Sequence, residues 1–86
     1  MSATTMTIKF YGTRWCGQCL AALRVLDNRK VPYEWINIDK DPEGEAFVKQ
    51  TNHGNRSVPT IVFPDGTILV EPSSTTLTAK LDTLDE

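Results

Sequence analysis

The sequence predicts an α/β domain built on a four-stranded mixed sheet with three helices. A strand-like run, a helix-like run and a second strand-like run follow one another within residues 6–38. A turn signal, Pro64-Asp65-Gly66, separates two later strand-like runs, and leucines recur with helical spacing near the C-terminus. The predicted order is therefore strand, helix, strand, helix, strand, strand, helix.

The first strand is predicted over residues 6–11, because Thr7-Ile8-Lys9-Phe10-Tyr11 alternates polar and apolar side chains before Gly12. A helix is predicted from Cys16 to about Asn28, and Pro32 prevents it from continuing further. Its buried face is expected to carry the residues that recur at intervals of three and four, namely Cys16, Cys19, Leu20, Leu23 and Leu26.

A second strand is predicted over Tyr33-Glu34-Trp35-Ile36-Asn37-Ile38, where β-favouring residues alternate again. Strand, helix and strand in succession form a βαβ unit, so the two strands should be parallel with a right-handed crossover. Both cysteines then fall at the C-terminal edge of the first strand. Open α/β sheets place their chemistry at that edge.

The second helix is predicted from Asp41-Pro42-Glu43, which supplies an N-cap, a first-turn proline and an acid, to about Asn52. Its inward residues are expected to be Ala46, Phe47 and Gln50. The hairpin is predicted to pair Thr60–Phe63 with Thr67–Val70.

The last helix is predicted to begin at Glu71-Pro72-Ser73-Ser74 and to bury Leu77, Leu81 and Leu84. The segment before the hairpin reads Ser57-Val58-Pro59-Thr60. A proline at the start of a strand that must approach a reactive thiol suggests a required backbone shape. We therefore predict a cis bond between Val58 and Pro59.

Length and composition indicate one small domain over residues 1–86, with residues 1–5 as a flexible tail. The net charge of −2 lacks the basic excess expected of a nucleic-acid-binding protein. No run approaches the about 18 apolar residues of a membrane span, and the first residues do not resemble a signal peptide. A cytoplasmic monomer that binds neither nucleic acid nor membrane is expected.

Cys16 and Cys19, the only cysteines, form a C-x-x-C pair at the junction of strand and helix. A cysteine at a helix N-terminus lies among unpaired N–H groups and the positive end of the helix dipole, which stabilise a thiolate. Cys16 is therefore predicted to be the nucleophile. Cys19 lies within disulfide reach, less than one helical turn away, and is predicted to be the resolving thiol.

Two other interpretations of the pair remain open. A zinc ion or a cluster usually needs four protein ligands, and His53 is far from the cysteines in sequence, so a metal or Fe–S carrier would require a dimer bridged by two C-x-x-C pairs. A structural disulfide closing so small a loop would stabilise the fold little. His53 itself is interpreted as a solvated residue at the end of the second helix.

The motif Trp15-Cys16-Gly17-Gln18-Cys19, followed by Ser57-Val58-Pro59-Thr60, resembles the glutaredoxin branch of the thioredoxin superfamily. Within that branch the chain is most similar to the mycoredoxins, which act on mycothiol mixed disulfides. The similar segments are Gly54-Asn55-Arg56-Ser57-Val58-Pro59-Thr60, Asp65-Gly66 and Pro72-Ser73. The resemblance implies the thioredoxin/glutaredoxin fold.

The resemblance also implies roles for individual residues. It assigns the nucleophile to Cys16, the resolving cysteine to Cys19 and the cis-proline to Pro59. Val58 would pair its backbone with the extended part of the substrate. Three further residues would bind substrate: Trp15 as a wall of the groove, and Arg14 and Arg56 as sources of positive potential.

The implied activity is that of a thiol–disulfide oxidoreductase reducing mixed disulfides between proteins and a low-molecular-weight thiol, and also protein disulfides. No metal or other cofactor is expected. Val70-Glu71-Pro72-Ser73 replaces the Gly-Gly-acid segment of many glutathione-using glutaredoxins, so mycothiol is favoured over glutathione. An alternative is an NrdH-type redoxin reduced by a flavoprotein, thioredoxin reductase, although the aromatic-Ser-Gly motif of those proteins is missing near the last helix.

Overall fold

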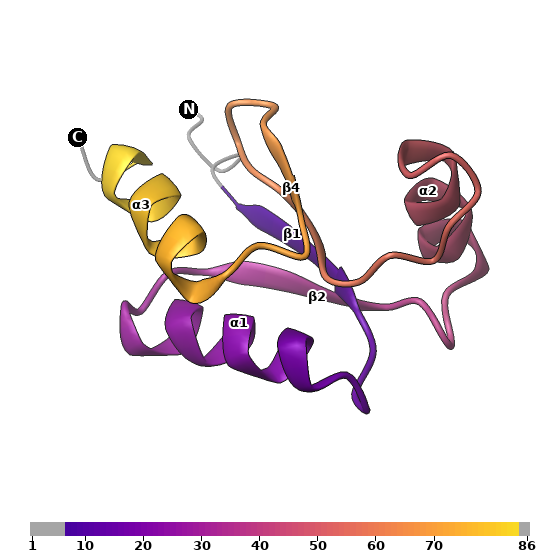
Figure 1. Ribbon diagram of the computed structural model, residues 1–86, viewed down its shortest axis with the longest axis horizontal. Helices are drawn as coiled ribbons and strands as arrows, with labels where there is room; N and C mark the ends of the chain where they lie inside the picture. The colour runs from indigo at the N-terminus through magenta and orange to yellow at the C-terminus, as the bar shows by residue number, and fades with distance from the viewer. Residues whose placement is uncertain (1–6, 85–86) are drawn as a thin grey trace.

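The computed structural model describes residues 7–84 and contains one four-stranded sheet in the order β2-β1-β3-β4 (Figure 1). The predicted succession of elements is confirmed. The strands and helices are β1 (Ile8–Gly12), α1 (Gly17–Asn28), β2 (Tyr33–Asn37), α2 (Pro42–Thr51), β3 (Thr60–Val62), β4 (Ile68–Val70) and α3 (Ser74–Leu84). The predicted tail, residues 1–5, and the first predicted strand residue, Met6, lie outside the described part of the chain.

The sheet is mixed, as predicted. β1 and β2 are parallel, with Gly12 opposite Asn37 at their C-terminal ends. β3 runs antiparallel to both β1 and β4, and its first residue, Thr60, lies opposite Tyr11. The end of β1 and the start of β3 therefore meet at one edge of the sheet. The chain leaves this edge from β1 toward α1 and arrives at it from α2 toward β3.

Helices cover both faces of the sheet, with α1 and α3 on one side and α2 on the other (Figure 1). Alternate residues of β1 point to opposite faces, as strand geometry requires. Ile8 and Phe10 join the core beneath α1 and α3, whereas Tyr11 joins the smaller core beneath α2. No helix within residues 7–84 combines the length and hydropathy needed to cross a bilayer.

The buried face of α1 differs in part from the predicted one. Cys19, Ala22 and Leu26 are buried, but Leu20 is 47 % exposed, so its assignment to the core was wrong. Leu20 and Leu23, three positions apart, widen the apolar stripe of the sequence beyond the face that this helix packs against the core. The small side chain of Ala22 faces the sheet instead.

The inward face predicted for α2 was wrong at two of its three residues, because Ala46 and Gln50 are exposed and only Phe47 is half-buried. Gly44 and Val48 are the buried residues. A Cβ atom on Gly44 would lie 2.8 Å from Ile36 Cγ2, so the absence of a side chain lets the helix lie against the sheet. A glycine contributes nothing to a hydrophobic periodicity, and the pattern could not identify it as an inward residue.

The C-terminal half matches its prediction closely. The hairpin turns at Gly66, whose φ is +91°, and Leu77 and Leu81 of α3 are buried. Leu84 is half-buried against the same core. Lys80 Nζ lies 2.6 Å from Asp65 Oδ2 and thus joins α3 to the hairpin turn.

Candidate active site at the start of helix α1

Cys16 is the N-cap residue of α1 and is partly exposed at the sheet edge described above. Its Sγ accepts a hydrogen bond from the Cys19 backbone N–H at 3.4 Å and donates to the Val58 carbonyl oxygen at 3.9 Å. The sulfur therefore takes the place that a Ser, Thr or Asp side chain fills at other helix starts. A backbone N–H donor is therefore aimed at this sulfur at the first turn of the helix.

Cys19 has the opposite environment. Its side chain is fully buried, and this burial is the largest cause that raises the pKa of its thiol to about 12. A hydrogen bond from the Thr13 backbone opposes the increase, while Cys16 and the negative charge of Glu71 add to it. Both cysteines are free thiols. The pair therefore consists of an accessible sulfur and a buried sulfur that holds its proton.

The peptide bond between Val58 and Pro59 is cis, as predicted. Two side chains hold this segment, one directly after Pro59 and one at the C-terminal end of α2. The Thr60 hydroxyl donates to the Ser57 carbonyl at 2.7 Å, and Asn52 Nδ2 donates to Thr60 Oγ1 at 3.2 Å. These bonds fix the segment whose Val58 carbonyl faces the Cys16 sulfur.

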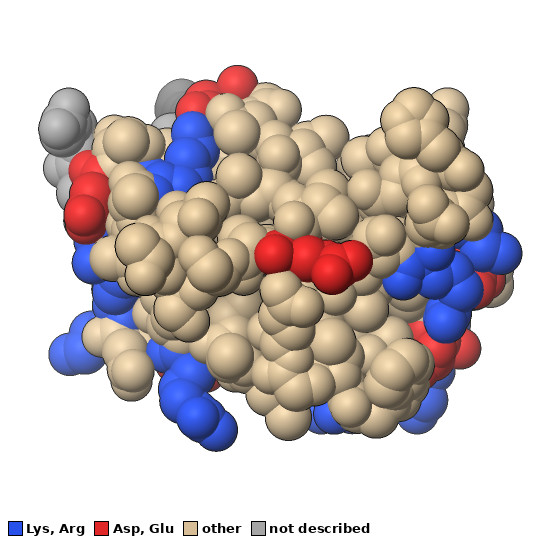
Figure 2. All heavy atoms as spheres, in the orientation of Figure 1, with Lys and Arg blue, Asp and Glu red and all other residues tan. Residues whose placement is uncertain are grey.

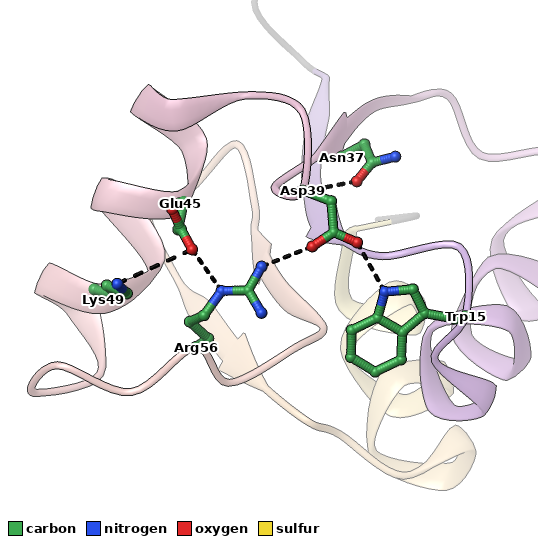
Figure 3. Close-up of polar contacts among 6 residues, drawn as sticks. All are labelled: Trp15, Asn37, Asp39, Glu45, Lys49 and Arg56. Atoms are coloured by element: carbon green, nitrogen blue, oxygen red, sulfur yellow. Dashed lines mark hydrogen bonds and ion pairs between the residues drawn. The ribbon is translucent and has the colours of Figure 1, made fainter.

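Trp15 lies at the end of a chain of polar contacts (Figure 3). Its indole N–H donates to Asp39 Oδ2 at 2.7 Å, and Arg56 binds Asp39 Oδ1 at 2.7 Å and Glu45 Oε2 at 2.6 Å. The hydrogen bonds from Arg56 and Trp15 lower the pKa of Asp39. The side chain of Trp15 is nevertheless 69 % exposed, and its role as a wall of a substrate groove stays a prediction.

The two arginines predicted to supply positive potential are differently placed. The charge of Arg56 faces two carboxylates, and its pKa is raised by the hydrogen bonds to Asp39 and Glu45. Arg14 lies over the ring of Trp35, 5.8 Å from its centroid. It lines a surface pocket of about 330 Å³ together with Leu20, Leu23, Tyr33 and Trp35. Substrate binding by either arginine stays a prediction.

Three residues that the sequence analysis gave no role lie at the site. Asp39 bonds to Trp15, and Gln18 Nε2 donates to the Glu71 carbonyl at 2.9 Å. The backbone N–H of Glu71 donates in turn to the Pro59 carbonyl at 2.8 Å. The only sequence signals were the position of Gln18 inside the C-x-x-C motif and the departure at Glu71 from a glycine pair.

His53 lies on the exposed turn after α2, with a φ of +59°, which agrees with the solvated position expected of it. Within residues 7–84, no three His, Cys, Asp or Glu side chains are grouped so that they could hold a metal ion. This observation concerns one chain and does not test a metal site shared between the C-x-x-C pairs of two chains.

The chain is similar to known proteins over most of its length. The family model described as glutaredoxin matches residues 8–68. Mycoredoxin 1 of Corynebacterium glutamicum is 38 % identical over 77 residues, which are 90 % of this chain and 95 % of that protein. The glutaredoxin-like protein NrdH of Escherichia coli is 33 % identical over 60 residues, which are 70 % of this chain and 72 % of that protein.

A solved structure supports the fold. The crystal structure of a glutaredoxin from Archaeoglobus fulgidus superposes with a TM-score of 0.70 at 23 % identity, covering 94 % of this chain and 95 % of that one. The family model and the relative at 38 % identity each extend over most of the chain, including both cysteines and Pro59 or its surroundings. The chain therefore belongs to the glutaredoxin family of thiol–disulfide oxidoreductases.

Proposed function

We propose that this glutaredoxin-family chain reduces mixed disulfides between proteins and a low-molecular-weight thiol, with mycothiol as the preferred thiol. Protein disulfides would be a second class of substrate. The observation that carries the proposal is the contrast between the two sulfurs, because Cys16 is accessible at a helix N-terminus while Cys19 is buried with its pKa raised to about 12. The similarity to mycoredoxin 1 supports mycothiol as the thiol.

The proposed reaction begins when the Cys16 thiolate attacks the sulfur of the low-molecular-weight thiol in a mixed disulfide. A Cys16–S bond forms as the substrate S–S bond breaks, and the protein half leaves as a thiolate. The thiolate of a second small-thiol molecule then attacks the small-thiol sulfur of this mixed disulfide. The bond to Cys16 breaks, Cys16 leaves as a thiolate, and the two small-thiol molecules leave as their symmetric disulfide. Cys19 takes no part in this route, which is consistent with its buried and protonated state.

For a protein disulfide the second step is intramolecular. Cys19 must lose its proton and attack the Cys16 sulfur, which releases the reduced protein and leaves a Cys16–Cys19 disulfide. Conversion of Cys16 into a disulfide removes its negative charge, one of the causes that raise the pKa of Cys19. Formation of the mixed disulfide thus lowers the pKa of Cys19 in part, while burial still raises it.

Val58 and Pro59 would position the substrate in this scheme. The Val58 carbonyl points at the Cys16 sulfur, so an extended substrate segment lying beside it would bring its own sulfur into line. Trp15 would close the other side of the groove. We propose that the protein acts in the cytoplasm as a monomer and needs no metal, flavin or nucleotide.

The test is reduction of one model protein carrying either a mycothiol or a glutathione mixed disulfide, with each thiol and its own reductase as the recycling system. We expect a higher kcat/KM with mycothiol. Cys16→Ser should abolish turnover, whereas Cys19→Ser should retain it with mycothiol. A clear preference for glutathione would refute the thiol assignment, and full activity of Cys16→Ser would refute the mechanism.

The similarity to the Escherichia coli NrdH protein supports a second candidate, a redoxin reduced by thioredoxin reductase. This route forms a Cys16–Cys19 disulfide in every cycle, so Cys19→Ser should abolish it. Direct reduction of the oxidised protein by NADPH and thioredoxin reductase, faster than by mycothiol, would favour the redoxin.

A metal or Fe–S carrier is the third candidate, with two chains sharing their C-x-x-C pairs. It predicts a coloured or metal-containing dimer after anaerobic purification. A colourless monomer with unchanged exchange activity after treatment with a chelator would exclude it.

A further inference from the structure

The backbone of Glu71 is bonded to both segments that form the site. Its N–H donates to the carbonyl of Pro59 at 2.8 Å, and its carbonyl accepts from Gln18 Nε2 at 2.9 Å. Gln18 lies between the two cysteines, and the residue before Pro59 faces the Cys16 sulfur. Glu71 also has a φ of +50°, a left-handed conformation that is uncommon outside glycine. These contacts fix the backbone of Glu71 against the two segments that carry the site.

None of the ion pairs found within residues 7–84 includes the carboxylate of Glu71. Other acids near the surface are paired: Asp39 and Glu45 pair with Arg56, and Asp65 pairs with Lys80. No lysine or arginine within residues 7–84 forms an ion pair with Glu71, which is exposed.

Most of the surface around this carboxylate is uncharged. Figure 2 shows acidic atoms over the segment that joins β4 to α3, with uncharged atoms on most sides and basic atoms close by on the side of α2. Glu71 is the only charged residue of the segment from Glu71 to Ser73. Its negative charge also contributes to the raised pKa of Cys19, so its electric field reaches the buried sulfur of the site. A substrate that approaches from this side therefore meets a negative charge that no ion pair within residues 7–84 neutralises.

We infer that Glu71 gives this site a charge preference, so that disulfides whose groups next to the sulfur are cationic or neutral react with Cys16 faster than anionic ones. The inference rests on the proposed function and narrows its substrate class. Neutral low-molecular-weight thiols and protein segments with lysine or arginine beside the disulfide would be favoured. Thiols carrying free carboxylates would be disfavoured.

The reaction that tests this preference is a single exchange step. The Cys16 thiolate attacks one sulfur of a symmetric small disulfide, a Cys16–S bond forms, and the other half leaves as a thiolate that takes a proton from water. No further oxidant or reductant is needed. One charge on a neighbouring exposed side chain, acting through partly aqueous surroundings, changes such a rate about two- to fivefold, and salt screens the effect.

The experiment uses the reduced full-length protein with Cys19→Ser, so that the reaction stops at the Cys16 adduct, which mass spectrometry counts over time. The probes are cystamine, which is cationic, 2-hydroxyethyl disulfide, which is neutral, and 3,3′-dithiodipropionate, which is anionic. Intrinsic reactivity differs among the three, so each rate is compared between Glu71 and Glu71→Gln on the same disulfide. Glutamine keeps the backbone contacts to Gln18 and Pro59.

We expect Glu71→Gln to accelerate the anionic disulfide about two- to fivefold, to slow the cationic one by a similar factor and to leave the neutral one unchanged. These differences should disappear in 1 M KCl. Glu34→Gln removes an equal charge from an exposed residue of β2 and should change none of the rates.

Two results would overturn the inference in distinguishable ways. If Glu71→Gln changes all three rates by the same factor, the residue affects reactivity or structure but not charge selection. If the protein with Glu71 intact reacts with none of the three disulfides, the exchange function itself is wrong, and the charge preference falls with it.

Discussion

Gly12 and Cys19 lie so close together that a Cβ atom on Gly12 would be 2.8 Å from Cys19 Sγ. Real contacts of this kind are essentially never under 3.0 Å, so the end of β1 must carry glycine for the buried sulfur to occupy its place. The glycine that marks the end of the predicted strand is thus also a packing requirement of the site.

Gly12→Ala is expected to destabilise the reduced protein by about 1–3 kcal/mol, because the methyl group overpacks the core at Cys19 and at the Phe10 ring, which would be 3.0 Å away. The loss of stability is measured as the change in the free energy of unfolding in urea. The matched control is Gly17→Ala, where a Cβ would meet nothing within 4 Å and the helix should gain up to about 1 kcal/mol. Equal stability of the two variants would contradict the packing argument.

Asp39→Ala is expected to leave the free energy of unfolding within about 1 kcal/mol of the original, since the contacts that it removes are exposed. The effect should appear instead at Trp15, whose indole N–H loses its acceptor. Its proton signal in a ¹H–¹⁵N spectrum should move upfield and exchange faster with water.

Lys49→Ala provides the control for Asp39, because Lys49 lies at the far end of the same chain of contacts, 4.0 Å from Glu45 (Figure 3). It should leave the Trp15 signal in place. An unchanged signal in Asp39→Ala would show that the contact does not hold Trp15 in solution.

Cys19 is expected to react very slowly with iodoacetamide in folded Cys16→Ser protein. Cys16→Ser removes the contribution of Cys16 to the raised pKa of Cys19, but burial, the largest cause, remains. Little of the thiol is therefore ionised at pH 8, and the rate should rise about tenfold per pH unit. Mass spectrometry of the alkylated protein follows the reaction. The same variant in urea should be modified much faster, so similar rates in the two conditions would refute the buried, protonated state of this thiol.

Asp65→Asn is expected to make stability less dependent on pH in acid. The Lys80 side chain and the Thr67 N–H lower the pKa of Asp65 from 3.8 to about 2. A depressed pKa in the folded state stabilises the fold above the unfolded pKa, and this contribution is lost as the pH falls from about 4 toward 2. Unfolding at several pH values between 2 and 5 should give a flatter curve for the variant, whereas two parallel curves would contradict the assignment.

The sequence predicted the framework well because the relevant signals are local. The alternation in Thr7-Ile8-Lys9-Phe10-Tyr11, the cap and proline at Asp41-Pro42, and the turn at Asp65-Gly66 each act within a few residues. The order of elements, the parallel pairing of β1 with β2 and the cis bond before Pro59 followed from such signals.

The contacts that surround the two cysteines could not be predicted in this way. Gln18 and Glu71 are 53 positions apart, and Trp15 and Asp39 are 24 apart. Neither pair has a spacing that periodicity can detect, since the sheet brings its members together only after folding. Exposed charged residues such as Glu71 also carry no burial signal.

The helix cap formed by Cys16 links the chemistry of the site to the integrity of the first turn. The Cys16 sulfur that accepts the Cys19 N–H is the same atom that must bond to a substrate. A disulfide sulfur is a weaker hydrogen-bond acceptor than a thiolate. Each captured substrate therefore leaves an amide at the helix entrance poorly satisfied, and each release satisfies it again. The backbone at the start of α1 thus favours release of the bound group from Cys16. The Cys19 amide proton should exchange with solvent fastest while Cys16 is in a mixed disulfide.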